Sequence, residues 1–163
     1  MIAQSTIFTT RRYIDTMNDD TTYSTKPGVG CLLEKAHQLM TSDLSKVLAE
    51  AGIDITVPEY LILRALYAED RLQQCEIADR LSKDRASVCR TIRSLERKQL
   101  VRTETISYKC QRVSLTDRSR QLESPISAVA TICHDHLLEA LSDQGVAQLE
   151  RLLTTIVTNY NLQ

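Results

Sequence analysis

The sequence is poor in aromatic residues and in the two residues that most often interrupt helices. Its 163 residues include no tryptophan, one phenylalanine and six tyrosines, together with four glycines and three prolines. Strand-rich folds draw on aromatic and β-branched residues and need many turns, whereas leucine-rich segments with few glycines and prolines form helices. The composition therefore argues against a mainly β fold and predicts a mainly α-helical one, most simply a single domain.

Long apolar runs are also missing. No stretch approaches the roughly 20 consecutive apolar residues that a membrane-spanning helix requires. Arg11 and Arg12 near the N-terminus precede no apolar stretch, so we expect no secretory signal. These absences predict a cytoplasmic protein without a membrane partner.

The sequence contains none of the patterns expected of a metal site or of the common catalytic sites. Its five cysteines are odd in number, widely spaced and never form C-x-x-C, which argues against a disulfide framework and a zinc ribbon. On a helix, His134 and His136 would point away from each other, whereas chelation needs an i, i+4 pair. No Ser/His/Asp order, glycine-rich phosphate loop or paired-carboxylate motif is present. We therefore expect no metal, no cofactor and no enzymatic activity.

Apolar periodicity begins only after a polar N-terminal segment. Residues 1–28 lack sustained periodicity and predict a flexible leader. Apolar residues at three- and four-residue spacing then predict a helix over residues 31–51, which Gly52 ends. Thr56 is the expected N-cap of a second helix, with Pro58 in its first turn.

The central part of the chain predicts a helix-turn-helix followed by a hairpin. A short helix is expected over residues 73–81, and Asp84 is the expected N-cap of the next helix. Alternation of period two predicts two short strands within residues 101–115. Helical periodicity then returns and predicts two helices between residues 116 and 160, with a kink or a break at Pro125 in the first of them.

The second helix of the pair, "DRASVCRTIRSLERK" at residues 84–98, carries five basic residues. From Arg71 to Arg112 the chain has eleven basic and five acidic residues, a local charge of +6 within a net charge of −1. Such segregation predicts an electrostatic footprint for nucleic acid, the alternative being an ordinary solvated helix face. Together with the neighbouring short helix and hairpin, the segment predicts a winged helix-turn-helix whose second helix enters the major groove of DNA.

On a helical wheel this helix separates a core face, made of Val88, Cys89, Ile92 and Leu95, from a polar face. The polar face mixes arginine, which can bind guanine through two hydrogen bonds, with small hydroxyl side chains that permit close approach. We expect base contacts from Ser87, Arg90 and Ser94. We expect phosphate contacts from Arg85, Arg97 and Lys98. The expected contact surface also includes Ala86, Thr91 and Arg93.

Several stretches resemble the multiple-antibiotic-resistance-regulator (MarR) family of winged helix-turn-helix transcriptional regulators. The most specific are "TVPEYLILRAL", "EIADRLSKDRASVCRTIRSLERKQLV" and "VSLTDRSRQL". The resemblance covers about residues 31–160 and implies a homodimeric transcription factor that binds double-stranded operator DNA. It implies a DNA-binding domain at residues 57–115 and a helical dimerisation region made of residues 29–56 and 116–163.

Two features depart from the family pattern. Gln99 stands where the family usually has the glycine that follows the DNA-reading helix, so a left-handed cap there would carry modest strain. The wing, "SYKCQR", looks shorter than usual and lacks the family's Asp-Arg pair, so Lys109 or Arg112 is the expected wing contact.

Family members are commonly controlled by a small phenolic ligand, a metal or cysteine oxidation. Cys31 begins the first long helix, in a position that resembles the reactive cysteine of the organic-hydroperoxide-sensing branch, although Ser45 and Val57 replace that branch's tyrosines. A helix N-terminus also favours the thiolate. Cys133 is a candidate disulfide partner across the dimer, and His37 lies where relatives line their effector pocket.

The sequence therefore predicts a homodimeric transcriptional regulator, and specifically a repressor that a phenolic effector or an oxidant releases from DNA. Two alternatives stay open at this point. One is a winged-helix module whose arginine face binds an acidic protein, and the other is a thiol peroxidase that uses Cys31.

Overall fold

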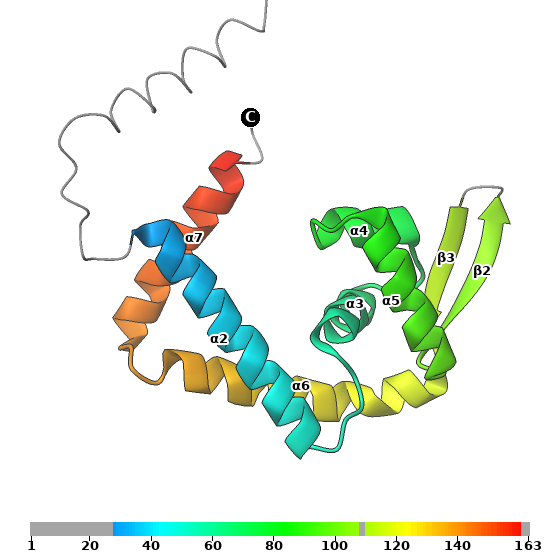
Figure 1. The fold of residues 1–163 in the computed structure, drawn as a ribbon, viewed down its shortest axis with the longest axis horizontal. Helices are drawn as coiled ribbons and strands as arrows, with labels where there is room; N and C mark the ends of the chain where they lie inside the picture. Colours follow the sequence, from blue (N-terminus) through cyan, green and yellow to red (C-terminus); the bar gives the residue numbers. More distant parts are fainter. Residues whose placement is uncertain (1–27, 108–109, 161–163) are drawn as a thin grey trace, which may run out of the picture. The chain divides into compact units, whose positions relative to one another are not determined.

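Figure 1 shows the fold as a computed structural model, which describes residues 28–107 and 110–160. The predicted mainly helical fold with a small β-hairpin wing is confirmed. All but the last residue of the predicted leader lies outside the described residues. The elements are α2 (Val29–Glu50), α3 (Val57–Ala68), β1 (Leu72–Gln73), α4 (Gln74–Arg80), α5 (Arg85–Arg97), β2 (Val101–Ser107), β3 (Cys110–Leu115), α6 (Asp117–Leu138) and α7 (Asp143–Tyr160).

The chain divides into two compact units, one ending at His37 and the other beginning at Gln38. Of the first unit, the structure describes residues 28–37, which include the opening turns of α2. The second unit contains every element from α3 onward. Within the described part of the chain, no helix is long and apolar enough to cross a bilayer.

The sheet has three antiparallel strands in the order β1-β3-β2. The predicted hairpin forms between β2 and β3, with Val101 opposite Leu115 and Thr103 opposite Val113. Strand β1 pairs with the other edge of β3 and places Leu72 opposite Val113. This third strand was not predicted, because two residues are too few to show the alternation by which a strand is recognised.

The core of the second unit lies where the helix-turn-helix packs on the sheet. Helix α5 contacts α3, α4 and β2, and in Figure 1 these helices gather beside the hairpin. The side chains at the centre of this core are 0% exposed: Leu63, Leu66, Ile77, Ile92, Leu95 and Val113. Packing of three helices and a sheet on one set of aliphatic side chains fixes the orientation of α5 relative to the wing.

Three helices end at a residue with a positive φ angle. Gly52, Ser82 and Gln99 follow α2, α4 and α5 with φ angles of 69°, 50° and 58°. After α5, the Leu100 amide donates to the Leu95 carbonyl at 2.9 Å, as in a Schellman motif. The left-handed cap predicted at Gln99 is therefore confirmed, and its side chain makes the conformation strained.

A kink or a break was predicted at Pro125; helix α6 is continuous from Asp117 to Leu138, so of the two the break does not occur. Proline removes one backbone donor from a helix, and the helix tolerates this loss where packing on both sides holds it together. Ile126 and Val129, just after the proline, are both 3% exposed. Their burial continues the apolar face past Pro125 and offsets the missing hydrogen bond.

Candidate nucleic-acid interface

Helix α5 is held at its start by a side-chain cap and along one face by the core. Asp84 Oδ1 accepts a hydrogen bond from the Ser87 amide at 2.7 Å, so the predicted N-cap is confirmed. Val88, Ile92 and Leu95 are at most 3% exposed and belong to the core cluster. Burial of these side chains holds one face of the helix inward and leaves the opposite face to solvent.

The outer face of α5 carries four exposed arginines, Arg85, Arg90, Arg93 and Arg97. None of their guanidinium groups forms an ion pair or a side-chain hydrogen bond within residues 28–107 and 110–160. Guanidinium donors without a protein acceptor are available to an external anion, and their planar geometry suits phosphate and the guanine edge. Ala86 is also exposed and leaves room for close approach beside them.

The three hydroxyl side chains predicted on this face are half-buried. Thr91 Oγ1 donates to the Ser87 carbonyl at 3.0 Å, a bond within the helix. The Ser94 hydroxyl lies close to the carboxylate of Glu59 in α3 and helps to lower the pKa of that carboxyl group. The Ser87 hydroxyl has no side-chain partner in the described part of the chain.

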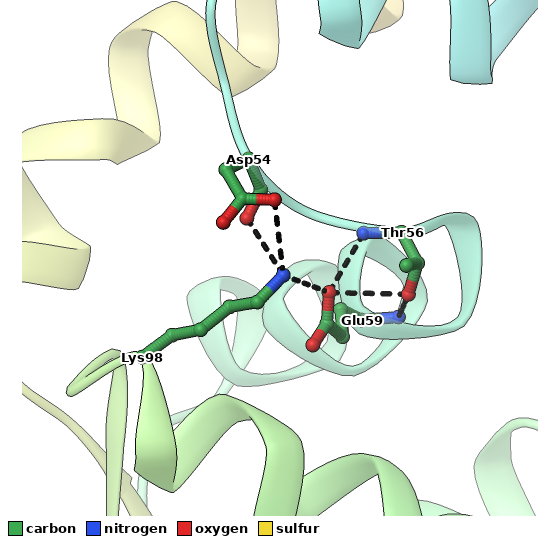
Figure 2. Close-up of polar contacts among 4 residues, drawn as sticks. All are labelled: Asp54, Thr56, Glu59 and Lys98. Carbon is green, nitrogen blue, oxygen red and sulfur yellow. Dashed lines mark hydrogen bonds and ion pairs between the residues drawn. The ribbon is translucent and has the colours of Figure 1, made fainter.

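Lys98, at the C-cap of α5, points its ammonium into the protein (Figure 2). Its Nζ lies 3.0 Å from Glu59 Oε2 and donates to the Asp54 carbonyl at 2.9 Å, with the Asp54 carboxylate at 3.4 Å. Burial opposes the charge, but the two carboxylates outweigh it and raise the pKa of Lys98. Because protein acceptors already neutralise this ammonium, we do not count Lys98 among the phosphate contacts.

Glu59 was not predicted as a site residue. In the sequence it fits a capping box with Thr56, and that box is present, with the Thr56 amide 2.7 Å from Glu59 Oε2. A glutamate in a capping box needs no partner beyond the helix end, so the sequence carries no signal of another role. The structure shows that Glu59 is 1% exposed and is bonded to Lys98, 39 residues later.

The wing contributes basic residues on its outward face. Arg112 lies in the middle of β3, half-buried and opposite Glu104 of β2. Because side chains alternate along a strand, Arg112 shares the face opposite buried Val113 with the exposed Arg102, which was not predicted. Lys109, the other predicted wing contact, lies outside the described residues.

A carboxylate joins α5 to the wing. Glu96 Oε1 accepts hydrogen bonds from the Thr103 amide at 3.1 Å and from Thr103 Oγ1 at 2.5 Å. Hydrogen bonds to an ionised acceptor are stronger than those between neutral groups. The start of β2 is therefore tied to the last turns of the helix that carries the arginines.

The predicted effector residues lie in different surroundings. Cys31 and His37 are exposed on the opening turns of α2. Cys133 is half-buried on α6, where burial and the adjacent Asp43 carboxylate both raise the pKa of its thiol. A raised pKa favours the thiol over the reactive thiolate. Cys89, predicted as a core residue of α5, is half-buried.

An open cavity of about 610 Å³ lies at the C-terminal end of α5. Its lining includes residues 52–55, Arg97, Lys98, Arg118 and Leu122. A volume of this size can hold a small organic molecule. Arg97 and Arg118, which form no ion pair with any described residue, favour an anionic one. His37 is not among the lining residues. In the described segments, no group of three or more His, Cys, Asp or Glu side chains is arranged to hold a metal ion.

Comparison with known proteins identifies the helix-turn-helix region. A sequence model of the MarR family matches residues 53–106, from the loop before α3 to β2. This winged helix is similar to the MarR family. The match confirms the predicted resemblance over the arginine-bearing helix and the first wing strand. No curated protein sequence matches the chain.

Solved structures of MarR-family regulators share the fold over most of the chain. The S. aureus MepR–DNA complex has a TM-score of 0.75 at 24% identity, covering 85% of this chain and 100% of that one. Bordetella bronchiseptica BpsR, solved in a study of its regulation by 6-hydroxynicotinic acid, has a TM-score of 0.76 at 19% identity, covering 85% and 99%. Wild-type MarR from E. coli has a TM-score of 0.67 at 22% identity, covering 80% and 98%. The MarR fold thus extends beyond the segment that the sequence model matches.

Proposed function

We propose that the chain is a sequence-specific DNA-binding transcriptional regulator that acts as a homodimer in the cytoplasm. The observation that carries the proposal is the row of exposed arginines on α5, free of protein acceptors in the described residues and set on a MarR-family winged helix. The S. aureus MepR structure, which has the same fold, is a complex with DNA. Arginines without protein acceptors, on the second helix of a winged helix-turn-helix, favour a surface that binds a polyanion over an ordinary solvated helix face.

In this proposal α5 lies in the major groove and divides its contacts between bases and phosphates. Arg90, in the middle of the helix, and Ser87, about one turn earlier, bind base edges, because a base contact requires the side chains that enter deepest. Arg85 and Arg97, near the two ends of the helix, bind phosphates on either side of the groove. Arg93 flanks this row and adds to the positive potential.

The remaining predicted contacts divide into those we keep and those we set aside. Lys98 is set aside because its ammonium binds Glu59 and Asp54, and Ser94 is set aside because its hydroxyl lies close to the Glu59 carboxylate. Arg112, on the outward face of the wing, is kept as a backbone contact together with Lys109. Neither is assigned a base, since a wing residue of this kind increases affinity more than it reads sequence.

The homodimer is supported by apolar side chains that the single chain leaves exposed. On α7, four large aliphatic residues are between 38% and 59% exposed: Leu149, Leu152, Ile156 and Val157. Further exposed aliphatic residues lie on α2 and α6: Val29, Leu32, Leu33, Leu39, Met40, Ile132 and Leu137. Large apolar side chains exposed along one helix, as on α7, mark an interaction surface on a soluble protein. We propose that a second copy of the chain covers them.

We further propose that the regulator is a repressor released by a small molecule or by oxidation of Cys31. The 610 Å³ cavity beside Arg97 gives a small anionic or phenolic effector a place to bind near the end of α5. Among the cysteines, Cys31 is favoured over Cys133 as the oxidised residue, because it is exposed and the Cys133 thiol has a raised pKa. Equal release from DNA of the wild type and of Cys31→Ser by cumene hydroperoxide would remove Cys31 from the mechanism.

A gel-shift titration against the DNA upstream of the chain's own reading frame tests the main proposal. We expect sequence-specific binding that weakens steeply with salt, with a loss of about 10³-fold or more between 50 and 200 mM for six or more phosphate contacts. Binding that ignores sequence, or none tighter than micromolar, contradicts the proposal. Binding to an acidic protein instead would favour the docking-module alternative, and catalytic turnover of peroxide would favour the thiol peroxidase.

A further inference from the structure

Glu59 is a buried carboxylate that the DNA contacts do not use. It is the one charged side chain among the described residues that is fully buried, at 1% exposure. Its Oε2 lies 2.7 Å from the Thr56 amide, 3.1 Å from Thr56 Oγ1 and 3.0 Å from Lys98 Nζ, as Figure 2 shows. Its Oε1 is buried and has no hydrogen-bond partner within the described segments. The compensation of this buried charge therefore depends on Lys98.

Glu59 is ionised despite its burial. Burial raises the pKa of a carboxyl group, but the Thr56 amide, the Ser94 hydroxyl and the Lys98 ammonium together hold the pKa of Glu59 below its ordinary value. The Glu59 carboxylate also lies in the first turn of α3, where the partial positive charge of the helix N-terminus favours an anion. An ionised, buried carboxylate exerts a strong and directional attraction on its cationic partner.

The cation that Glu59 binds lies at the C-terminal end of α5, because Lys98 is the C-cap of that helix. Its ammonium is held between Glu59 Oε2 and the Asp54 carbonyl, at 3.0 and 2.9 Å. Arg97 lies on the neighbouring strip of the surface, about 100° around the helix from Lys98. A buried carboxylate that holds Lys98 therefore sets the rotation of the last turn of α5, and with it the direction in which Arg97 points.

We propose that Glu59 is a positioning residue for DNA recognition: through Lys98 it fixes the rotation of the arginine-bearing helix against α3. The inference rests on the proposed DNA-binding function. Asp54 assists by accepting a hydrogen bond from Lys98 through its carbonyl, at 2.9 Å. The role assigned to Lys98 is thus to hold the helix, while the arginines bind DNA.

Four variants separate positioning from phosphate binding: Lys98→Met, Glu59→Gln, the double variant Glu59→Gln/Lys98→Met, and Arg97→Gln as the matched control. Lys98→Met leaves the buried carboxylate without its cation, so affinity for the specific site should fall about tenfold. The double variant removes both charges, keeps an acceptor for the Thr56 amide, and should recover most of that loss. Glu59→Gln alone should lose less affinity for the specific site than Lys98→Met does, because Lys98 keeps its bonds to Asp54.

The salt dependence of DNA binding gives a second test of whether Lys98 positions the helix or binds phosphate. Lys98→Met should leave the slope of log K against log salt unchanged, whereas Arg97→Gln should reduce its magnitude by about one, as the loss of one phosphate contact does. A reduced slope for Lys98→Met, with no recovery in the double variant, would show that Lys98 binds phosphate and would overturn the inference.

Hydrogen exchange of the amides in residues 95–100 tests the positioning without DNA. We expect about tenfold faster exchange there in Lys98→Met than in the wild type, with protection restored in the double variant. If Lys98→Met does not fold, amide exchange in Glu59→Gln is compared with that of the wild type instead. We then expect a smaller increase in the exchange rate. Exchange unchanged in every variant would overturn the inference. Failure of the wild type to bind DNA would instead refute the proposed function. The exchange experiment contains no DNA, so its result does not depend on that function.

Discussion

At the scale of single residues, the left-handed cap at Gln99 is a point where a substitution should stabilise the protein. Gln99 has a φ angle of 58°, and its backbone amide donates to the Glu96 carbonyl at 2.9 Å. Glycine adopts this conformation without a Cβ clash, so we expect Gln99→Gly to raise the free energy of unfolding by about 0.5–1 kcal/mol. Urea denaturation measures the change. The control Arg93→Gly, at an exposed position in the interior of α5, should lower stability by about 1 kcal/mol. Equal destabilisation by both would contradict the strain assigned to Gln99.

Asp70 is a second residue whose contribution to stability can be measured, through its dependence on pH. Its oxygens accept hydrogen bonds from the Leu115 and Arg71 amides, at 2.9 Å and 2.8 Å, and pair with Arg120. Burial opposes ionisation, but these donors hold the pKa of Asp70 below its ordinary value of 3.8. A depressed folded pKa stabilises the protein above the unfolded pKa, and this stability is lost as the pH falls through the folded value.

We therefore expect Asp70→Asn to lower the free energy of unfolding by about 1–2 kcal/mol at pH 7. The difference from the wild type should shrink as the pH falls below about 4, because protonation removes the same charge from the wild type. Urea denaturation across this pH range measures both curves. Glu104→Gln, at an exposed carboxylate with no ion pair in the described residues, is the control and should change neither curve. A constant difference at all pH values would show that Asp70 does not act through its charge.

At the scale of elements, the helices and their caps follow from local sequence, whereas several contacts between elements do not. Thr56 and Asp84 cap their helices as predicted, because a cap depends on residues within one turn of it. Strand β1 escaped prediction because its two residues become a strand only when β3 lies beside them. The same holds for Glu59 and Lys98, whose pairing depends on how α3 packs against α5.

The candidate interface shows the same division between local pattern and packing. The exposed positions of Arg90 and Arg93 could be predicted, since helical periodicity separates an inward from an outward face. The inward orientation of Lys98 could not, because the helical wheel places it on the polar face and only the position of Glu59 in α3 turns its ammonium inward. A helical wheel does not show contacts between a long side chain and a neighbouring helix.

At the scale of the whole molecule, the exposed apolar face of α7 predicts the oligomeric state. Leu152 and Ile156 are each 51% exposed. A glutamate at position 156 would be buried without a partner in a dimer, so Ile156→Glu should dissociate it. Light scattering after size-exclusion chromatography should give twice the chain mass of 18.5 kDa for the wild type and a single chain mass for the variant. Thr154→Glu, on the other side of α7, should remain a dimer. A monomeric wild type would refute the homodimer.

The charge of the molecule is divided between its parts in a way that suits DNA binding. Residues 71–112 carry a net charge of +6, while the whole chain carries −1. The positive charge is concentrated on the segment that contains α5 and the wing, which steers that face toward a polyanion. The acidic remainder of the chain has the same sign as DNA and so disfavours binding in other orientations.

The specificity ratio of wild type and Arg90→Ala is the most direct test of the account. It is the affinity for a selected site divided by that for a scrambled duplex, measured at one salt concentration. We predict a ratio of about 10³ or more for the wild type. Arg90→Ala should lower the ratio about tenfold or more, because a lost base contact weakens specific binding alone. Arg97→Ala should weaken binding to both duplexes by similar factors, as a lost phosphate contact does. A wild-type ratio near one, or a ratio unchanged in Arg90→Ala, would contradict sequence reading by α5.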